Sequence, residues 1–263
     1  MSRAAESTHW YDHAGAPCYT QTKADGGLRN TTLADARKLL LRPSVTTIIK
    51  VADKPQINKW KERQLMMAFL TLPKVDGESL ESLEARLWKD AYAHTDMAIA
   101  RGTAIHAEIE QGFYSRKNQS PYYTAVRNEL SRLFPNVNNW KAEESFSCSS
   151  YGGKIDLMAA VSDVEGIIVD FKVKEFKDDD NVEKFVYDEH GMQLCAYGEG
   201  LGFMKYTCVN IFVRPEACGG IMVKTYFHKD EDMYRQWKMF QALLAYWQYS
   251  KNYFCKSKEQ DNE

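Results

Sequence analysis

Residues 151–173 read YGGKIDLMAAVSDVEGIIVDFKV, and this stretch is the most informative about the fold. Two apolar segments flank a short acidic turn, which predicts an antiparallel β-hairpin. Each predicted strand carries one carboxylate where its apolar pattern is interrupted, Asp156 in the first strand and Asp170 in the second. Because side chains alternate along a strand, we expect Asp170 and Lys172 on one face and Phe171 in a core on the other.

The charged residues of this hairpin predict a metal site. Two carboxylates beside one ammonium group suit a hard divalent cation, because such ions prefer oxygen ligands. An isolated Asp-x-Lys at the end of a strand is more often a solvated charge pair. Here, about one helix downstream, the sequence adds Gln193 and Tyr197, whose spacing of four residues puts them on one helix face. The combination favours a functional site over an ordinary strand edge.

Four short motifs follow one another along residues 101–197. In order and spacing they resemble the motifs of the PD-(D/E)xK nuclease superfamily, specifically its RecB-like branch, which includes phage-type exonucleases. The four together are far more specific than any one of them. In this sequence the motifs are Gly102-x-x-x-His106, Gly153-x-x-Asp156, Asp170-x-Lys172 and Gln193-x-x-x-Tyr197.

The resemblance implies a set of catalytic residues and metal ligands. Asp156, Asp170 and Lys172 would be catalytic, and His106 would join the two aspartates as a metal ligand. A lone histidine on a helix is more often a hydrogen-bonded residue at the edge of a core. Its position ahead of the carboxylate hairpin matches the family, however, and favours the ligand role. Gly102, one turn earlier on the same face, would leave room for a backbone or a substrate.

The same resemblance implies the chemistry of the site. The cofactor would be Mg²⁺ or Mn²⁺, and the imidazole tilts the preference toward Mn²⁺ because it is a softer ligand than a carboxylate. The ion would lower the pKa of a bound water and shield the scissile phosphate, while Lys172 positions or activates that water. Gln193 and Tyr197 would orient the substrate, or Lys172, through hydrogen bonds.

The expected fold class is α/β, with a restriction-endonuclease-like central mixed sheet of about five strands flanked by helices. The expected organisation is an N-terminal helical region packed on the core (residues 1–95), a nuclease core (96–250) and a charged tail (251–263). Sequence dense in Ala, Leu, Glu, Lys and Arg predicts two helices at about 78–93 and 96–115, with a break between them.

The function implied by the resemblance is metal-dependent exonucleolytic hydrolysis of DNA, in phage DNA recombination, repair or degradation. Three alternatives stay open: an endonuclease of the same fold, a protein of this fold that only binds nucleic acid, and an unrelated metal-dependent hydrolase of small phosphoesters. The intact set of two aspartates, a lysine and a histidine argues against lost catalysis. The expected partners are DNA and a single-strand-annealing or recombination protein.

Composition narrows the class of protein. The 263 residues are 44% apolar and 27% charged, which is typical of a globular chain able to bury a substantial core. The formal net charge of −2 does not by itself indicate nucleic acid, although a local basic groove would be sufficient for binding. The sequence contains no phosphate-binding Gly-x-x-x-x-Gly-Lys-Ser/Thr loop and no apolar run of the roughly eighteen residues that span a bilayer. We therefore expect no ATP hydrolysis, no membrane association and a cytoplasmic location, which is the host cytoplasm if the chain is phage-encoded.

Other residues of metal-binding type lack ligand spacing. Six cysteines are scattered without a Cys-x-x-Cys pair, which argues against a zinc ribbon or a redox pair and predicts free thiols. Some RecB-like nucleases carry a four-cysteine iron–sulfur cluster, but the tight cysteine grouping that this cluster uses is missing here, so we expect none. Residues 9–13 include two histidines and an aspartate, and we expect a surface loop or a short hairpin there.

Overall fold

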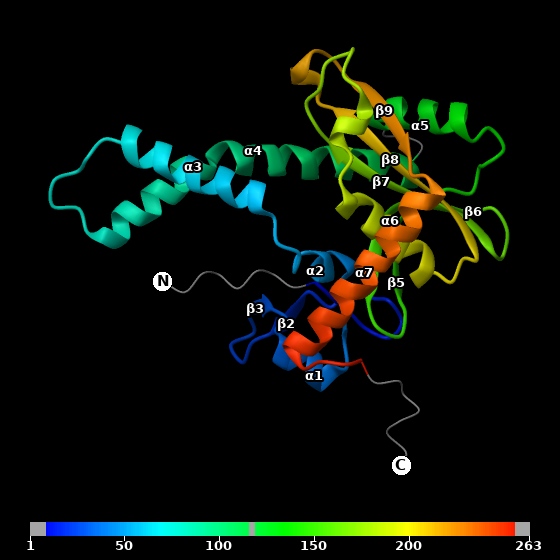
Figure 1. Cartoon of the computed structure of the whole chain (residues 1–263), viewed down its shortest axis with the longest axis horizontal. Coiled ribbons are helices and arrows are strands. Elements are labelled where there is room, and N and C mark those ends of the chain that lie inside the picture. Colours follow the sequence, from blue (N-terminus) through cyan, green and yellow to red (C-terminus); the bar gives the residue numbers. More distant parts are fainter. Residues whose placement is uncertain (1–8, 116–118, 256–263) are drawn as a thin grey trace. The chain divides into compact units, whose positions relative to one another are not determined.

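The computed structural model describes residues 9–115 and 119–255 and shows a mixed α/β protein (Figure 1). Within these described ranges there are seven α-helices and one five-stranded mixed sheet. The chain divides into two compact units, the first made of residues 1–51 and 108–263 and the second of residues 52–107.

The five-stranded sheet belongs to the first unit and confirms the predicted mixed sheet. Its strands follow the chain order across the sheet, and each pair is antiparallel except the parallel pair β7–β8. The predicted hairpin is confirmed as β6 and β7, in which Leu157 lies opposite Val169. The strands are β5 (Lys141–Ser147), β6 (Gly152–Ala160), β7 (Glu165–Val173), β8 (Lys205–Arg214) and β9 (Met222–Phe227).

Helices cover both faces of this sheet (Figure 1). The parallel β7–β8 pair requires a crossover, and the chain makes it through the short 3₁₀ helix η1 (Val182–Phe185) and α6 (Asp188–Gly200). Helix α7 (Asp230–Lys251) packs on α6. Helix α5 (Pro121–Leu133) packs against β8 and β9, where Thr225 Oγ1 donates a hydrogen bond of 2.7 Å to Glu129.

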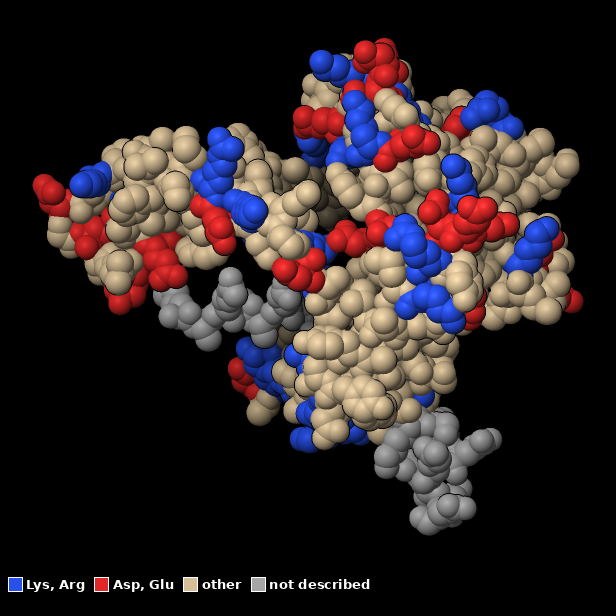
Figure 2. Space-filling model, in the orientation of Figure 1, with Lys and Arg blue, Asp and Glu red and all other residues tan. Residues whose placement is uncertain are grey.

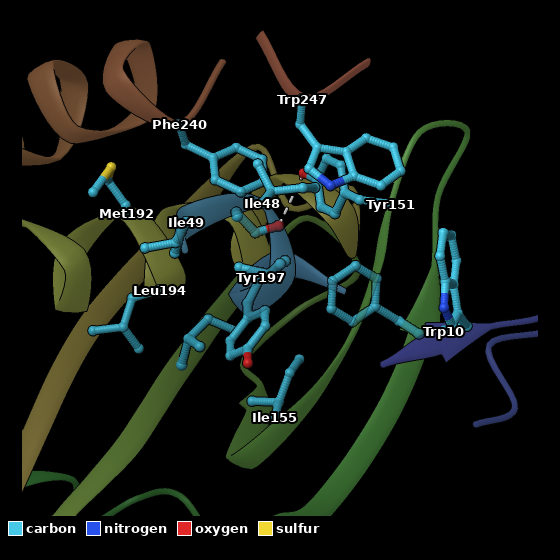
Figure 3. Close-up of a cluster of buried hydrophobic side chains, with 14 of the residues drawn as sticks. Trp10, Ile48, Ile49, Tyr151, Ile155, Met192, Leu194, Tyr197, Phe240 and Trp247 are labelled. Carbon is cyan, nitrogen blue, oxygen red and sulfur yellow. Dashed lines mark hydrogen bonds between the residues drawn. The ribbon is translucent and has the colours of Figure 1, made fainter. Parts of the chain in front are cut away.

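A large apolar cluster lies between α6, α7 and the sheet (Figure 3). Phe240 of α7 is fully buried, stacks on Trp237 and meets the Tyr151 ring edge-on at 5.1 Å. The Tyr151 hydroxyl donates to the carbonyl of Ala196 at 3.0 Å, so its one polar atom in the cluster is satisfied. Tyr197 lies at the other side of the cluster, and its hydroxyl points away from Phe240 (Figure 3).

Residues 9–50 contribute to this core through short strands and helices. Trp10 and Tyr11 are buried, so the expected surface placement of residues 9–13 is wrong for these two side chains. Trp10 makes edge contacts with Trp247 and Tyr253, and this aromatic packing attaches the short strand β1 to the core. The elements are β1 (Trp10–Tyr11), β2 (Thr20–Thr22), β3 (Leu28–Asn30), α1 (Leu33–Leu39), β4 (Arg42–Pro43) and α2 (Val45–Ile49).

The second unit is built from α3 (Pro55–Thr71) and most of α4 (Leu80–Tyr114). Helix α4 is continuous, so the predicted break near His94–Asp96 is wrong. Relative to alanine, His94, Thr95 and Asp96 each lower helix stability by only about 0.5 kcal/mol. The strong helix formers on both sides of them outweigh this cost. The expected boundary between residues 95 and 96 falls inside this helix. The two helices are joined by the bond from the Tyr92 hydroxyl to the Lys61 carbonyl, at 3.4 Å.

In the described part of the chain, no helix is both long and apolar enough to cross a membrane. Most of the predicted charged tail, residues 256–263, lies outside the described residues.

Candidate metal and catalytic site

The central feature of the site is an ion pair on strand β7. Asp170 is 2% exposed, and the Lys172 ammonium lies 2.8 Å from its Oδ2 and 3.0 Å from its Oδ1. Phe171, between them, is buried on the opposite side of the strand. The alternation expected from the sequence is therefore confirmed. It brings a carboxylate and an ammonium onto one largely buried face, where each needs further polar partners.

The second carboxylate comes from β6, where the sheet is irregular. Asp156 Oδ2 accepts a 2.8 Å hydrogen bond from the backbone N–H of Phe171, the residue that follows Asp170. The hydrogen-bonded pairs of β6 with β7 run only from Leu157 to Ala160, so this N–H is taken by the side chain instead of a ladder carbonyl. Across from Asp156, Glu143 of β5 has a φ of 54°, which is uncommon for a residue other than glycine. The irregularity places Asp156 beside the ion pair.

Helix α6 covers this group of charges with the predicted Gln-x-x-x-Tyr pair. Gln193 Oε1 accepts a hydrogen bond of 3.3 Å from Lys172, and its Nε2 donates to the Tyr197 hydroxyl at 2.9 Å. Their shared helix face is therefore confirmed. A Cβ added at Gly153 would lie 2.7 Å from the Tyr197 ring, so glycine at this motif position lets the helix approach β6 closely.

The ionisation of the site follows from burial and from the two carboxylates. Burial disfavours the charged form of Lys172, but Asp170 and Asp156 outweigh it, so the pKa of Lys172 is raised and the ammonium form is stabilised. The pKa of Tyr197 is raised first by burial and then by Asp156 and Asp170, so the phenol keeps its proton. The pKa values of Lys172 and Tyr197 are both raised by Asp156 and by Asp170, so the two carboxylates lie close to both groups.

His106 lies on α4 in the second unit, four residues after Gly102 on the same helix. The structure brings together Asp156, Asp170, Lys172, Gln193 and Tyr197, all in the first unit. Metal ligation by His106 therefore stays a prediction.

The carboxylate pair fits a divalent cation by its chemistry. Among residues 9–115 and 119–255, no group of three or more His, Cys, Asp or Glu side chains is placed to hold a metal ion. Asp170 Oδ1 accepts one hydrogen bond, from Lys172, and a carboxylate oxygen can accept a second interaction. Asp156 and Asp170 supply carboxylate oxygens, which are the ligands that a hard divalent cation prefers.

Two residues behind Asp170 were missed by the sequence interpretation. Asn210 of β8 is fully buried and donates from Nδ2 to Asp170 Oδ2 at 2.7 Å. His228, just after β9, contacts the Asn210 Oδ1 through its Nε2 at 2.8 Å. The sequence does contain a signal for Asn210, because this residue interrupts the apolar run Cys-Val-Asn-Ile-Phe-Val. A polar side chain in a buried strand usually has a hydrogen-bond partner, which points to a polar residue nearby.

Tyrosines from the N-terminal segment also lie near the site. The hydroxyls of Tyr11 and Tyr19 are 2.6 Å apart. The pKa of Tyr11 is raised by burial first, then by Tyr19 and by Tyr197, so this pair lies within electrostatic range of the α6 tyrosine. Nothing in the spacing of residues 9–19 indicates that approach, since it depends on the pairing of β1 with β4.

Comparisons with known proteins do not name a family. No protein family matches the chain, and no curated protein matches it either. One solved structure with some similarity is the crystal structure of SSO0001, which is 12% identical over 71% of this chain and 86% of its own chain. The TM-score is 0.27, and a similarity at that level carries no argument about fold or function.

We predict that His190, one turn before Gln193 on α6, makes stability depend on pH. Burial, followed by the charge of Lys172, lowers the pKa of His190 from 6.5 to about 4. The unfolded chain then takes up a proton that the folded chain does not, so this contribution is fully present above pH 6.5 and is lost as the pH falls toward 4. At about 1.4 kcal/mol per pKa unit, it amounts to about 3 kcal/mol.

The measurement is urea unfolding of the wild type and His190→Gln at pH 7.5, 5.5 and 4.5. The free energy of unfolding of the wild type should fall more steeply with decreasing pH than that of the variant. Parallel curves for the two proteins would contradict the prediction.

Proposed function

We propose that this chain is a divalent-metal-dependent deoxyribonuclease of the PD-(D/E)xK type, with a restriction-endonuclease-like core, that acts as an exonuclease. One observation carries the proposal. Lys172 donates to both Asp170 and Gln193, so side chains of two separate motifs meet at one ammonium group. Asp156 joins them through the Phe171 backbone. If Asp170 and Lys172 were an ordinary solvated ion pair, water would satisfy the ammonium group. The hydrogen bond from Lys172 to Gln193, on a separate helix, therefore favours a functional site.

Each side chain would have a distinct part in phosphodiester hydrolysis. A bound Mg²⁺ or Mn²⁺ would supply an activated water and neutralise charge on the phosphate. Asp156 and Asp170 would hold that ion through their oxygens, with His106 as a further proposed ligand. The raised pKa of Lys172 suits a positive donor that stabilises the increasingly negative phosphate and positions the attacking water, more than it suits a general base.

The α6 residues would keep that lysine in place. Gln193 accepts from Lys172 and donates to Tyr197, so the amide fixes the direction of the ammonium. The phenol of Tyr197 retains its proton and would serve as a hydrogen-bond donor to substrate. These contacts support an orienting role for both residues without assigning either a proton transfer.

DNA is the proposed substrate, and a single-strand-annealing or recombination protein is the proposed partner. On the face of the first unit drawn in Figure 2, lysines and arginines are interspersed with acidic side chains. That mixture agrees with the formal net charge of −2. Recognition of DNA would therefore depend on local contacts near the site more than on a strong overall attraction, and it would still weaken with salt.

We predict that metal binding and catalysis separate when Asp170 and Lys172 are changed one at a time. Asp170→Ala should abolish DNA cleavage and weaken Mn²⁺ binding, because it removes a ligand. Lys172→Ala should keep Mn²⁺ affinity and lose turnover by about 10²-fold or more, the usual scale for a positioned electrostatic group. Calorimetry with Mn²⁺ and single-turnover cleavage of end-labelled DNA measure the two effects.

Lys205→Ala is the matched control for these variants. Lys205 begins β8, is exposed and pairs with Glu165 at 3.0 Å, so its removal should change neither quantity. Full activity of the wild type in excess chelator, or loss of metal binding in Lys172→Ala, would contradict the assigned roles.

The exonuclease assignment has its own test. Linear duplex DNA should be degraded progressively from its ends, while a covalently closed circular plasmid survives at the same metal and salt concentrations. Salt must be held constant because phosphate contacts make binding depend steeply on ionic strength. Rapid cutting of the closed plasmid would favour the endonuclease alternative. Hydrolysis of a nucleotide monoester without cleavage of DNA would favour a small-phosphoester hydrolase.

A further inference from the structure

A buried amide supports the Asp170 carboxylate from the neighbouring strand. Asn210 lies directly opposite Asp170 in the parallel register of β7 and β8, so both side chains project from the same face of the sheet. Its Nδ2 lies 2.7 Å from Asp170 Oδ2 and 3.3 Å from the Asp170 carbonyl oxygen. Lys172 contacts the same carboxylate, so the two donors restrict its rotation.

A second buried residue supports the orientation of that amide. His228 is 7% exposed, and its backbone N–H donates to the Cys208 carbonyl at 3.0 Å, which holds it beside the end of β9. Its Nε2 lies 2.8 Å from Asn210 Oδ1. A carbonyl oxygen can only accept, so Nε2 carries the hydrogen in this contact. With Oδ1 held by His228, the amide must present its N–H groups to Asp170.

The opposite orientation of the amide would be unfavourable. It would place Oδ1 of Asn210 against a carboxylate oxygen and turn the Nδ2 hydrogens toward the Nε2–H of His228. A buried polar group left without a partner costs about 1 to 3 kcal/mol, and two acceptors in contact add repulsion. The carboxylate and the Nε2–H of His228 therefore favour the same orientation of the amide, and the histidine adds to its stability.

We propose that Asn210 and His228 are positioning residues that fix the Asp170 carboxylate for cation binding, with His228 acting through Asn210. This inference rests on the proposed function, because it assigns Asp170 the role of metal ligand. A purely structural reason for the pair is weaker. Cys208 and Phe212, the neighbours of Asn210 on the same face of β8, are fully buried and apolar, so an apolar residue at position 210 would fill the strand without needing a buried histidine.

The test uses the full chain and Mn²⁺ alone as the probe, measured by calorimetry. Asn210→Leu keeps the approximate volume and removes the donor, and it should raise the Kd for Mn²⁺ by about 10- to 100-fold, as for other partners of metal-ligating groups. His228→Leu should weaken Mn²⁺ binding in the same direction. His228→Gln retains an N–H donor and should recover most of the affinity. The two His228 variants keep the test valid if Asn210→Leu does not fold.

Tyr253→Phe is the control for loss of buried hydrogen bonds. The Tyr253 hydroxyl contacts the carbonyl oxygens of Leu41 at 2.6 Å and Ala36 at 3.0 Å, in the apolar cluster. Its removal should lower Tm and leave the Kd for Mn²⁺ unchanged. If the Asn210 and His228 variants behave in the same way, with lower Tm and wild-type Kd, the pair is structural only and the inference is overturned.

Calorimetry also separates this inference from the proposed function. A wild type that binds Mn²⁺ but cleaves no DNA would overturn the nuclease proposal, while the affinities of the His228→Leu and His228→Gln variants would still decide the positioning role. A wild type that binds no Mn²⁺ would overturn both. On linear DNA, Asn210→Leu should lower kcat more than it raises KM, because the change acts on the bound cation and not on a contact with DNA.

Discussion

A carboxylate and an ammonium two residues apart on the central strand must both be satisfied where little water reaches them. Much of the surrounding arrangement follows from this constraint. Asp170 takes hydrogen bonds from Lys172 along its own strand and from Asn210 across the parallel pair. Lys172 is bonded in turn by Gln193, which ties helix α6 to the sheet. Asp156 adds a second carboxylate beside the ion pair, and carboxylate oxygens are the ligands that hard cations prefer.

The fold provides this arrangement through one parallel pair in an otherwise antiparallel sheet. The crossover between β7 and β8 is what lays α6 over the strand that carries the ion pair. Close packing of that helix depends on Gly153, where no larger residue would clear the Tyr197 ring. On the far side of α6, Phe240 and Trp247 of α7 form the apolar cluster that holds the helix in position (Figure 3). The position of the charged site therefore depends on an apolar cluster on the other side of α6.

Short-range patterns were sufficient for the hairpin, the shared face of Asp170 and Lys172, and the shared face of Gln193 and Tyr197. Each of these depends only on strand or helix periodicity. The remaining features depend on contacts between distant segments. Asn210 lies next to Asp170 because of the register of β7 and β8. Trp10 is covered in part by Trp247 of α7, a residue far from it in the sequence. The predicted break in α4 failed for a local reason, since a few weak helix formers do not end a long helix.

The central claim is that Asp156 and Asp170 together bind a divalent cation. The most direct test is X-ray diffraction from crystals soaked in Mn²⁺, with data collected near the manganese absorption edge. We expect an anomalous peak between the two aspartates, within bonding distance of an oxygen of each and with the Lys172 ammonium outside the ligand set. A peak elsewhere, or none between these carboxylates, would contradict it.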